Sequence, residues 1–264
     1  MLEDYTIFLW LLKLGAVTNI YFLLTMPGLG VGGTHAHLIF PAQILFCVSA
    51  YRCLFPVRYE DNIVFHAVFS SVFATRLLAT FAEVAFIYLL SHVVRRLNVN
   101  QIGWVAGLSW LMVVQIIICQ GFVWIAVLTD WWEFYFYEEF GWVLICAASA
   151  IASAYLYVTV DTLGHERVLL QLNLLFGAVY LPWQVFNLRA IRANARRNYE
   201  RSRAGAQSFS QRLAAGLTRS IRVKNPRRDA AAWGGLIGLS WMTGYWATLI
   251  PMWVYYIVGV LATN

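Results

Sequence analysis

Long apolar runs separated by short polar segments dominate the pattern of this chain. A helix rises about 1.5 Å per residue, so roughly 20 apolar residues span a hydrocarbon core about 30 Å thick. Little of the chain lies outside seven such runs, which predict an all-α integral membrane protein: a bundle of about seven transmembrane helices in one polytopic domain. The predicted spans are residues 5–25, 38–56, 62–92, 101–128, 141–160, 167–188 and 232–261.

The composition excludes a soluble domain. The chain is 61% hydrophobic and only 12% charged, whereas soluble domains carry about 25% charged residues. Aromatic clusters such as 131–137 fit amphipathic rings at the level of the lipid headgroups. The residues before the first run lack the basic region and the cleavage site of a signal peptide, so we expect that run to remain as a span.

Segment 189–228 differs from the rest, because it holds twelve of the nineteen basic residues and one acid, Glu200. Positive loops stay on the cytoplasmic side, or on the matrix or stromal side in an organelle, so we expect this segment and the N-terminus there. Arg95 and Arg96 would then lie on the opposite side, which counts against this topology, but the larger block outweighs them. The arginines expected to bind lipid or a partner are Arg189, Arg192, Arg196, Arg197, Arg201, Arg203, Arg212, Arg219 and Arg222.

Part of this basic segment is amphipathic. Apolar residues recur every four positions at Phe209, Leu213, Leu217 and Ile221, and the nearby arginines lie off that line. The pattern resembles a short helix in the plane of the interface, with its arginines toward anionic headgroups. An ordinary solvated loop is the alternative. Nucleic-acid binding is disfavoured, because the segment has no recognised nucleic-acid-binding motif.

The third span, 62–92, contains ionisable residues where a charge costs roughly 2.5–3.5 kcal/mol to insert. Arg76 and Glu83 share one helix face but lie about 10 Å apart along the axis, too far for an ideal direct pair. His66 lies further toward the start of the span and is turned about 80° from Arg76. Three roles stay open: a polar lock between helices, a proton or ion path, and a site for the polar end of a substrate.

A second polar cluster lies between the fourth and fifth spans. Glu138 and Glu139 are expected to open the fifth helix, where carboxylates favour the positive end of the dipole. The cluster serves either for helix capping with ion pairs to the basic segment, or for general acid and base chemistry. Its members are Asp130, Glu133, Glu138 and Glu139.

The sequence predicts no cofactor and no metal site. His35 and His37 supply two ligands, which do not close a site. The last span has no lysine for a retinal. Two signals for close helix packing are present, namely the small-residue face 146–154 and the pair Gly234 and Gly238.

Three functions fit these features. The leading hypothesis is a non-catalytic subunit or scaffold of a larger membrane assembly, which contacts anionic lipids through its basic segment and docks other membrane proteins or itself. The second is a transporter or channel for protons, ions or a small solute that uses Arg76, Glu83 and His66. The third is an intramembrane enzyme that modifies a lipid or an isoprenoid, with Glu83, Glu138 or Glu139 as its general acid or base.

Overall fold

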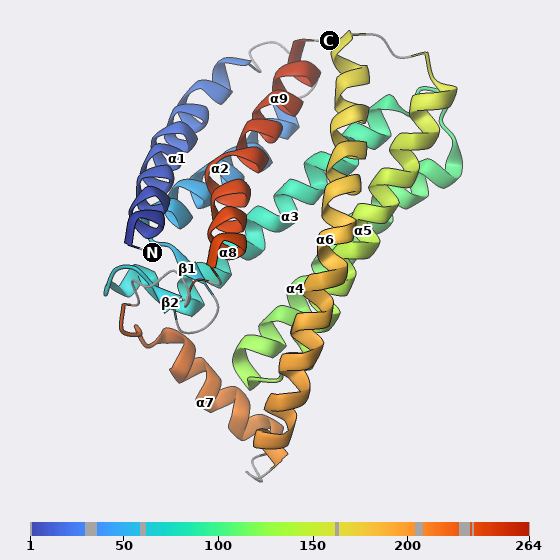
Figure 1. Ribbon diagram of the computed structural model, residues 1–264. Coiled ribbons are helices and arrows are strands. Elements are labelled where there is room, and N and C mark those ends of the chain that lie inside the picture. The colour runs from blue at the N-terminus through green and yellow to red at the C-terminus, as the bar shows by residue number, and fades with distance from the viewer. Residues whose placement is uncertain are drawn as a thin grey trace. The chain divides into compact units, whose positions relative to one another are not determined.

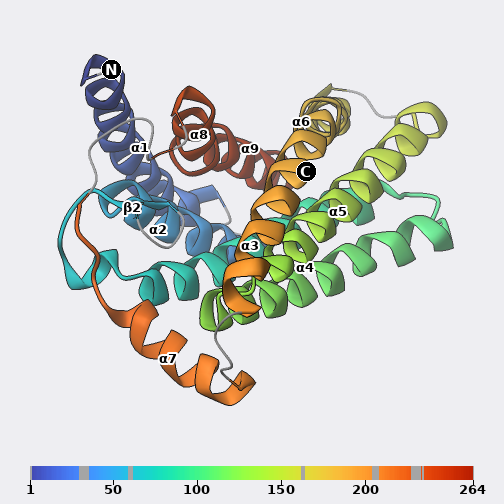
Figure 2. The same ribbon diagram turned by 60° about the horizontal axis from the view of Figure 1, so that its bottom comes forward.

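The computed structural model describes residues 2–29, 36–58, 62–161, 164–203, 208–226, 233 and 235–263. Most of these residues lie in helices (Figure 1, Figure 2). The α-helices are α1 (Leu2–Leu29), α2 (Ile39–Leu54), α3 (Val72–Leu97), α4 (Gly103–Thr129), α5 (Trp132–Thr159), α6 (Gly164–Arg203), α7 (Phe209–Ile221), α8 (Gly235–Met242) and α9 (Leu249–Thr263). The shorter elements are the 3₁₀ turns η1 (Ala36–Leu38) and η2 (Val68–Ser70), the strands β1 (Val57–Arg58) and β2 (Asn62–Ile63), and the π-helical turn η3 (Thr243–Ala247).

Six of the described helical segments are long and apolar enough to cross a membrane, which makes the chain an all-α multi-pass membrane protein. The expected count of seven is not confirmed. The second predicted span contains α2, whose 16 residues rise only about 24 Å. The six segments are Tyr5–Gly28, Val72–Leu97, Gly103–Thr129, Trp132–Thr159, Gly164–Ala193 and Gly238–Leu261.

The third predicted span begins later than expected. Residues 62 and 63 form β2, which pairs antiparallel with β1, and α3 begins only at Val72. Ser71 has extended backbone angles, and its side-chain oxygen accepts a hydrogen bond from the N–H of Ala74 at 3.3 Å. This is the geometry of an N-cap. Ser71 therefore sets the start of α3, and a hydropathy pattern does not contain this signal.

Two other predicted spans are parts of longer helices. Helix α5 begins at Trp132 rather than at 141, so it includes the aromatic run that the sequence placed in a connection. Helix α6 does not end at residue 188 but continues to Arg203, and its 40 residues rise about 60 Å. Hydropathy marks where a helix leaves the hydrocarbon and not where it ends, which explains both differences.

The described chain forms two compact units. One comprises Met1–Leu89 and Arg219–Asn264. Within this unit the ring of Phe22 stacks on that of Tyr255, with centroids 4.3 Å apart. Helix α1 approaches η3 closely at Gly15, because a Cβ there would overlap Ala247. The contact between α1 and η3 therefore depends on the missing side chain at Gly15.

The other unit, Leu90–Thr218, contains α4, α5 and α6, which lie side by side in chain order (Figure 1, Figure 2). The small-residue face 146–154 packs against α6 of the same unit. A Cβ on Gly177 would lie 2.9 Å from that of Ala150, and the amide of Asn173 donates to Ser153 Oγ at 3.0 Å. The face that the sequence marked for close packing therefore serves this chain itself.

The glycine pair at the start of α8 has a related use. Gly234 lies outside the described residues. Gly238 leaves room for the guanidinium of Arg58, which donates to the carbonyl oxygen of Trp233. This glycine therefore accommodates a side chain from β1 within the same unit.

Candidate functional site

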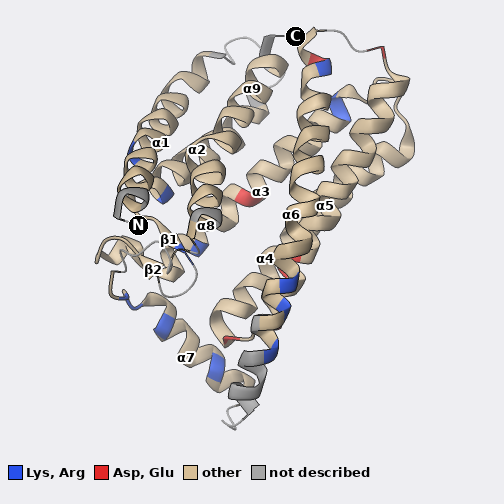
Figure 3. Cartoon of the chain, in the orientation of Figure 1, with Lys and Arg blue, Asp and Glu red and all other residues tan. Residues whose placement is uncertain are grey.

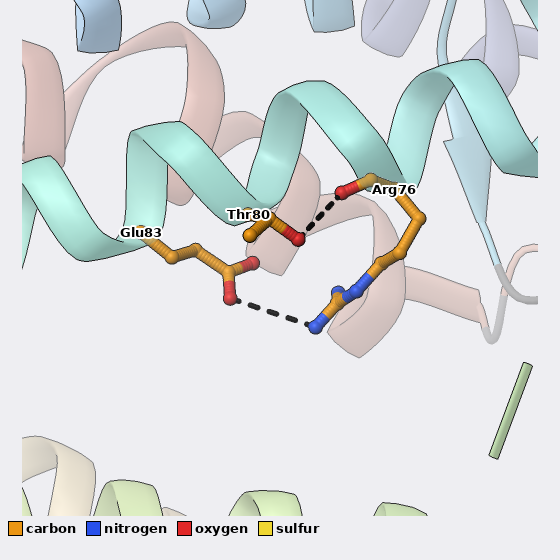
Figure 4. A network of polar contacts seen from close by, with 3 residues as sticks. All are labelled: Arg76, Thr80 and Glu83. Carbon is orange, nitrogen blue, oxygen red and sulfur yellow. Dashed lines mark hydrogen bonds and ion pairs between the residues drawn. The ribbon is translucent and has the colours of Figure 1, made fainter. Parts of the chain in front are cut away.

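Arg76 and Glu83 point to the same side of α3 and form an ion pair (Figure 4). Arg76 Nη2 lies 3.6 Å from Glu83 Oε2, and the two side chains are 19% and 8% exposed. Between them Thr80 donates to the carbonyl oxygen of Arg76 at 3.0 Å. The expectation that seven residues separate the pair too widely is wrong, because both long side chains extend along the helix toward one another.

A second arginine joins this pair from another helix. Arg52 lies in the last turn of α2 and is half-buried. Its charge is repelled by Arg76 and attracted by Glu83. Arg52, Arg76 and Glu83 are called the charge cluster below. With two guanidiniums and one carboxylate, the cluster carries a net charge of +1.

The guanidinium of Arg52 lies among soft, apolar groups of the last span. Its Nη2 is 3.8 Å from Met242 Sδ, and its central carbon is 5.0 Å from the ring centroid of Trp246. The indole supplies a cation–π attraction that partly offsets the loss of water around the arginine. Neither neighbour carries a negative charge to balance it.

The π-helical turn η3 holds Trp246 in this position. The carbonyl oxygen of Trp246 accepts a hydrogen bond from Asn19 Nδ2 at 3.0 Å and lies 3.6 Å from Cys53 Sγ. A π-turn is a costly irregularity that is frequent at functional sites. Here it ties the backbone of the last span to α1 and α2 and places the indole beside Arg52.

The structure separates His66 from helix α3. His66 lies between β2 and η2 and is exposed. Sequence analysis therefore named two members of the charge cluster, Arg76 and Glu83, and overlooked Arg52. A signal for Arg52 was present, since it is a basic residue inside the predicted span 38–56.

The four acids of the second cluster have different surroundings. Asp130 is the exposed C-cap of α4 with φ of 59°, and Glu133 lies in the first turn of α5. Glu138 is buried, and Glu139 accepts a 2.6 Å hydrogen bond from Gln184 Nε2 of α6. Since α5 begins at Trp132, Glu138 and Glu139 do not open that helix as expected.

Gln184 is the centre of a buried polar network between α5 and α6. It is fully buried, donates also to the hydroxyl of Tyr180, and accepts from Asn187 Nδ2 at 2.9 Å. An amide that bonds to Glu139 in this way gives that carboxylate a packing role between helices.

Two arginines of the basic segment lie over aromatic rings near the turn from α4 to α5. The guanidinium carbon of Arg192 is 5.9 Å from the ring centroid of Phe136, and that of Arg212 is 5.7 Å from Trp131. The rings of Trp131 and Phe209 are 5.7 Å apart. These five residues are called the basic aromatic surface below.

Helix α7 contributes to this surface and packs against the end of α4. A Cβ at Gly216 would overlap the carbonyl oxygen of Leu128, so the helices approach closely there. Phe209, Leu217 and Ile221 are nevertheless exposed.

Basic residues follow the second half of α6 and α7 (Figure 3). Arg189, Arg192, Arg196 and Arg222 are exposed, Arg212 and Arg219 are half-buried, and the side chains of Arg197, Arg201 and Arg203 lie outside the description.

Within the described ranges, no group of three or more His, Cys, Asp or Glu residues is placed to hold a metal ion. Of the residues flagged for metal chemistry, His35 lies outside those ranges and His37 is exposed. Comparison of the chain with protein-family models, with curated proteins and with solved structures found no match.

Proposed function

We propose that the chain is a membrane transporter that moves a proton, an ion or a small charged solute, with the charge cluster on the path. The observation that supports this is a cluster of three charges among apolar helices, in which Glu83 forms an ion pair with Arg76 and attracts Arg52 from a greater distance. Ionisable residues in transmembrane helices commonly mark ion and substrate pathways.

A purely structural role explains the cluster less well. A charge cluster that only holds helices together destabilises the fold least when its charges cancel, because each uncompensated charge is costly in a medium of low dielectric constant. The chain also ties helices together without charge, through Asn19 to η3 and through Asn173 to Ser153. The second arginine adds a charge that such a lock does not need.

Flux measurements on the full chain in liposomes test the proposal. Proton flux is followed with an enclosed pH-sensitive dye, and uptake of labelled chloride, phosphate and acetate is measured in parallel. We expect flux above that of empty liposomes, and loss of most of it in Glu83→Gln. Glu166→Gln, which removes a carboxylate from the first turn of α6, is the matched control and should keep its flux. Absence of flux from the parent protein would refute the proposal.

A second candidate function rests on the basic aromatic surface. In this second proposal the chain is a non-catalytic subunit that docks other membrane proteins. It binds anionic lipid through α7 and the end of α6, on the cytoplasmic, matrix or stromal side. Exposed Phe209, Leu217 and Ile221 beside arginines suit an interfacial helix. The small-residue face supports this less than expected, because it packs within the chain.

Two measurements address the subunit hypothesis. Gentle solubilisation of the native membrane should release a large complex of fixed composition, whereas one or two copies of this chain alone would contradict it. Phosphatidylglycerol should raise the melting temperature of the purified protein more than phosphatidylcholine does. Arg212→Gln should reduce that difference, since each basic residue near an anionic surface contributes about 1 kcal/mol. Lys13→Gln, an exposed site on α1, is the control.

The enzyme hypothesis has the least support. Of its proposed acids and bases, Glu139 is engaged by the amide of Gln184, and Glu83 is paired with Arg76. Both carboxylates are therefore already engaged by other side chains of the same chain.

A further inference from the structure

Arg52 presents a guanidinium whose charge is balanced only at a distance. A guanidinium offers five N–H donors. In the described part of the chain, no carboxylate lies within 4.0 Å of Arg52, and its Nη2 donates to the thioether of Met242. Its Nε is buried and has no hydrogen-bond acceptor among the described residues. The arginine is therefore held in place by Met242 and Trp246, and most of its donors stay available.

We propose that Arg52 binds the anionic group of the transported solute, a carboxylate or a phosphate, beside the Arg76–Glu83 pair. This inference rests on the proposed transport function and names the class of its substrate. One bound anion of unit charge would bring the cluster to two positive and two negative charges. A planar guanidinium suits such a ligand, because it matches carboxylate and phosphate oxygens with two parallel hydrogen bonds.

The sign of the cluster favours an anion over a cation. A cation would meet a cluster with a net charge of +1. The one carboxylate of the cluster, on Glu83, is already paired with Arg76 at 3.6 Å. An anion would be attracted by both arginines, of which Arg76 is 19% exposed and Arg52 half-buried. Attraction between unlike charges is also stronger here than in water, because the surrounding side chains have a low dielectric constant.

Calorimetric titration of the purified full chain in a neutral detergent tests the site. The ligands are acetate, inorganic phosphate, decanoate and decanol, so that charge and apolar tail vary independently. We expect saturable binding of at least one anion at one equivalent, and none of decanol. Binding of acetate or phosphate would identify a small free anion, and binding of decanoate alone an amphiphile such as a fatty acid.

Three variants assign the site. Arg52→Gln should weaken binding at least about tenfold, as expected for the loss of one charge-assisted hydrogen bond. Arg52→Lys, which keeps the charge, should retain part of the affinity. Lys13→Gln removes an exposed positive charge from α1 and should bind as the parent does.

The outcomes separate this inference from the transport proposal. No saturable anion binding, or equal binding by the parent and a folded Arg52→Gln, would overturn the anion site. If Arg52→Gln does not fold, weakened anion binding by the folded Arg52→Lys supports the site, and undiminished affinity counts against it. Anion binding without flux in liposomes would refute transport and support the anion site. Proton flux without anion binding would support transport and refute the anion site.

Discussion

Glu83→Gln removes the carboxylate of the charge cluster and leaves both guanidiniums in place. At the observed 3.6 Å, opposite unit charges attract by about 5 kcal/mol at an effective dielectric constant of about 20. The substitution recovers part of this energy, because burying the neutral amide of glutamine costs less hydration free energy than burying the carboxylate of glutamate. Removing one partner of a buried ion pair costs about 3–5 kcal/mol, and partial exposure of Arg76 places the expected loss of stability near the lower value.

The same reasoning predicts a different result for Arg52→Gln. This change removes the repulsion between Arg52 and Arg76 and the smaller attraction between Arg52 and Glu83, while the Arg76–Glu83 pair stays intact. It also loses the cation–π contact with Trp246, worth about 0.5–2 kcal/mol. These effects oppose one another, so we expect stability within about 1 kcal/mol of the parent. A structural lock would instead require all three residues, and each substitution would destabilise the protein to a similar degree.

Thermal unfolding of the purified chain in neutral detergent, followed by tryptophan fluorescence, distinguishes these cases. For a chain of this size 1 kcal/mol corresponds to about 2–4 °C, so Glu83→Gln should lower Tm by about 6–12 °C. Arg52→Gln and the exposed control Lys13→Gln should stay within about 4 °C of the parent. The reasoning is refuted if Glu83→Gln melts with the control, or if Arg52→Gln falls as far as Glu83→Gln.

Two close helix contacts give further predictions. Gly15→Ala should destabilise the protein by about 1–3 kcal/mol in the same assay, since its Cβ overlaps Ala247. Gly121→Ala has nothing within 4 Å and should be neutral or stabilising by up to about 1 kcal/mol; equal effects would contradict the contact. Gly216→Leu should undock α7 from α4 and speed hydrogen exchange of its backbone amides, whereas Ala215→Leu, at an exposed position, should not.

Hydropathy predicted the membrane class and the approximate position of most helices, because long apolar runs leave few alternatives to a helix in lipid. It failed at the ends of helices. The start of α3 depends on the hydroxyl of Ser71, and the length of α6 on arginines that continue a helix beyond the apolar run. Neither effect is large on a hydropathy scale, so both boundaries were displaced by about ten residues or more.

The candidate site was predicted in part. The seven-residue spacing correctly placed Arg76 and Glu83 on one face of a helix. It could not show that the side chains meet, since that depends on rotamers that span about two turns. Arg52 was overlooked because a basic residue near the end of a span resembles an ordinary flanking charge. Its role follows only from the packing of α2 against the last span, which is a long-range feature.

The stoichiometry of the charge cluster links its stability to its proposed function. Hydropathy assigns a cost to each charge separately, and on that basis three ionised residues in this region are simply unfavourable. Pairing offsets the cost for Arg76 and Glu83, and Trp246 offsets part of it for Arg52. The remaining positive charge has no structural benefit that the described contacts reveal. At the proposed site, a bound anion would reduce this electrostatic cost, so the imbalance that destabilises the cluster would strengthen anion binding.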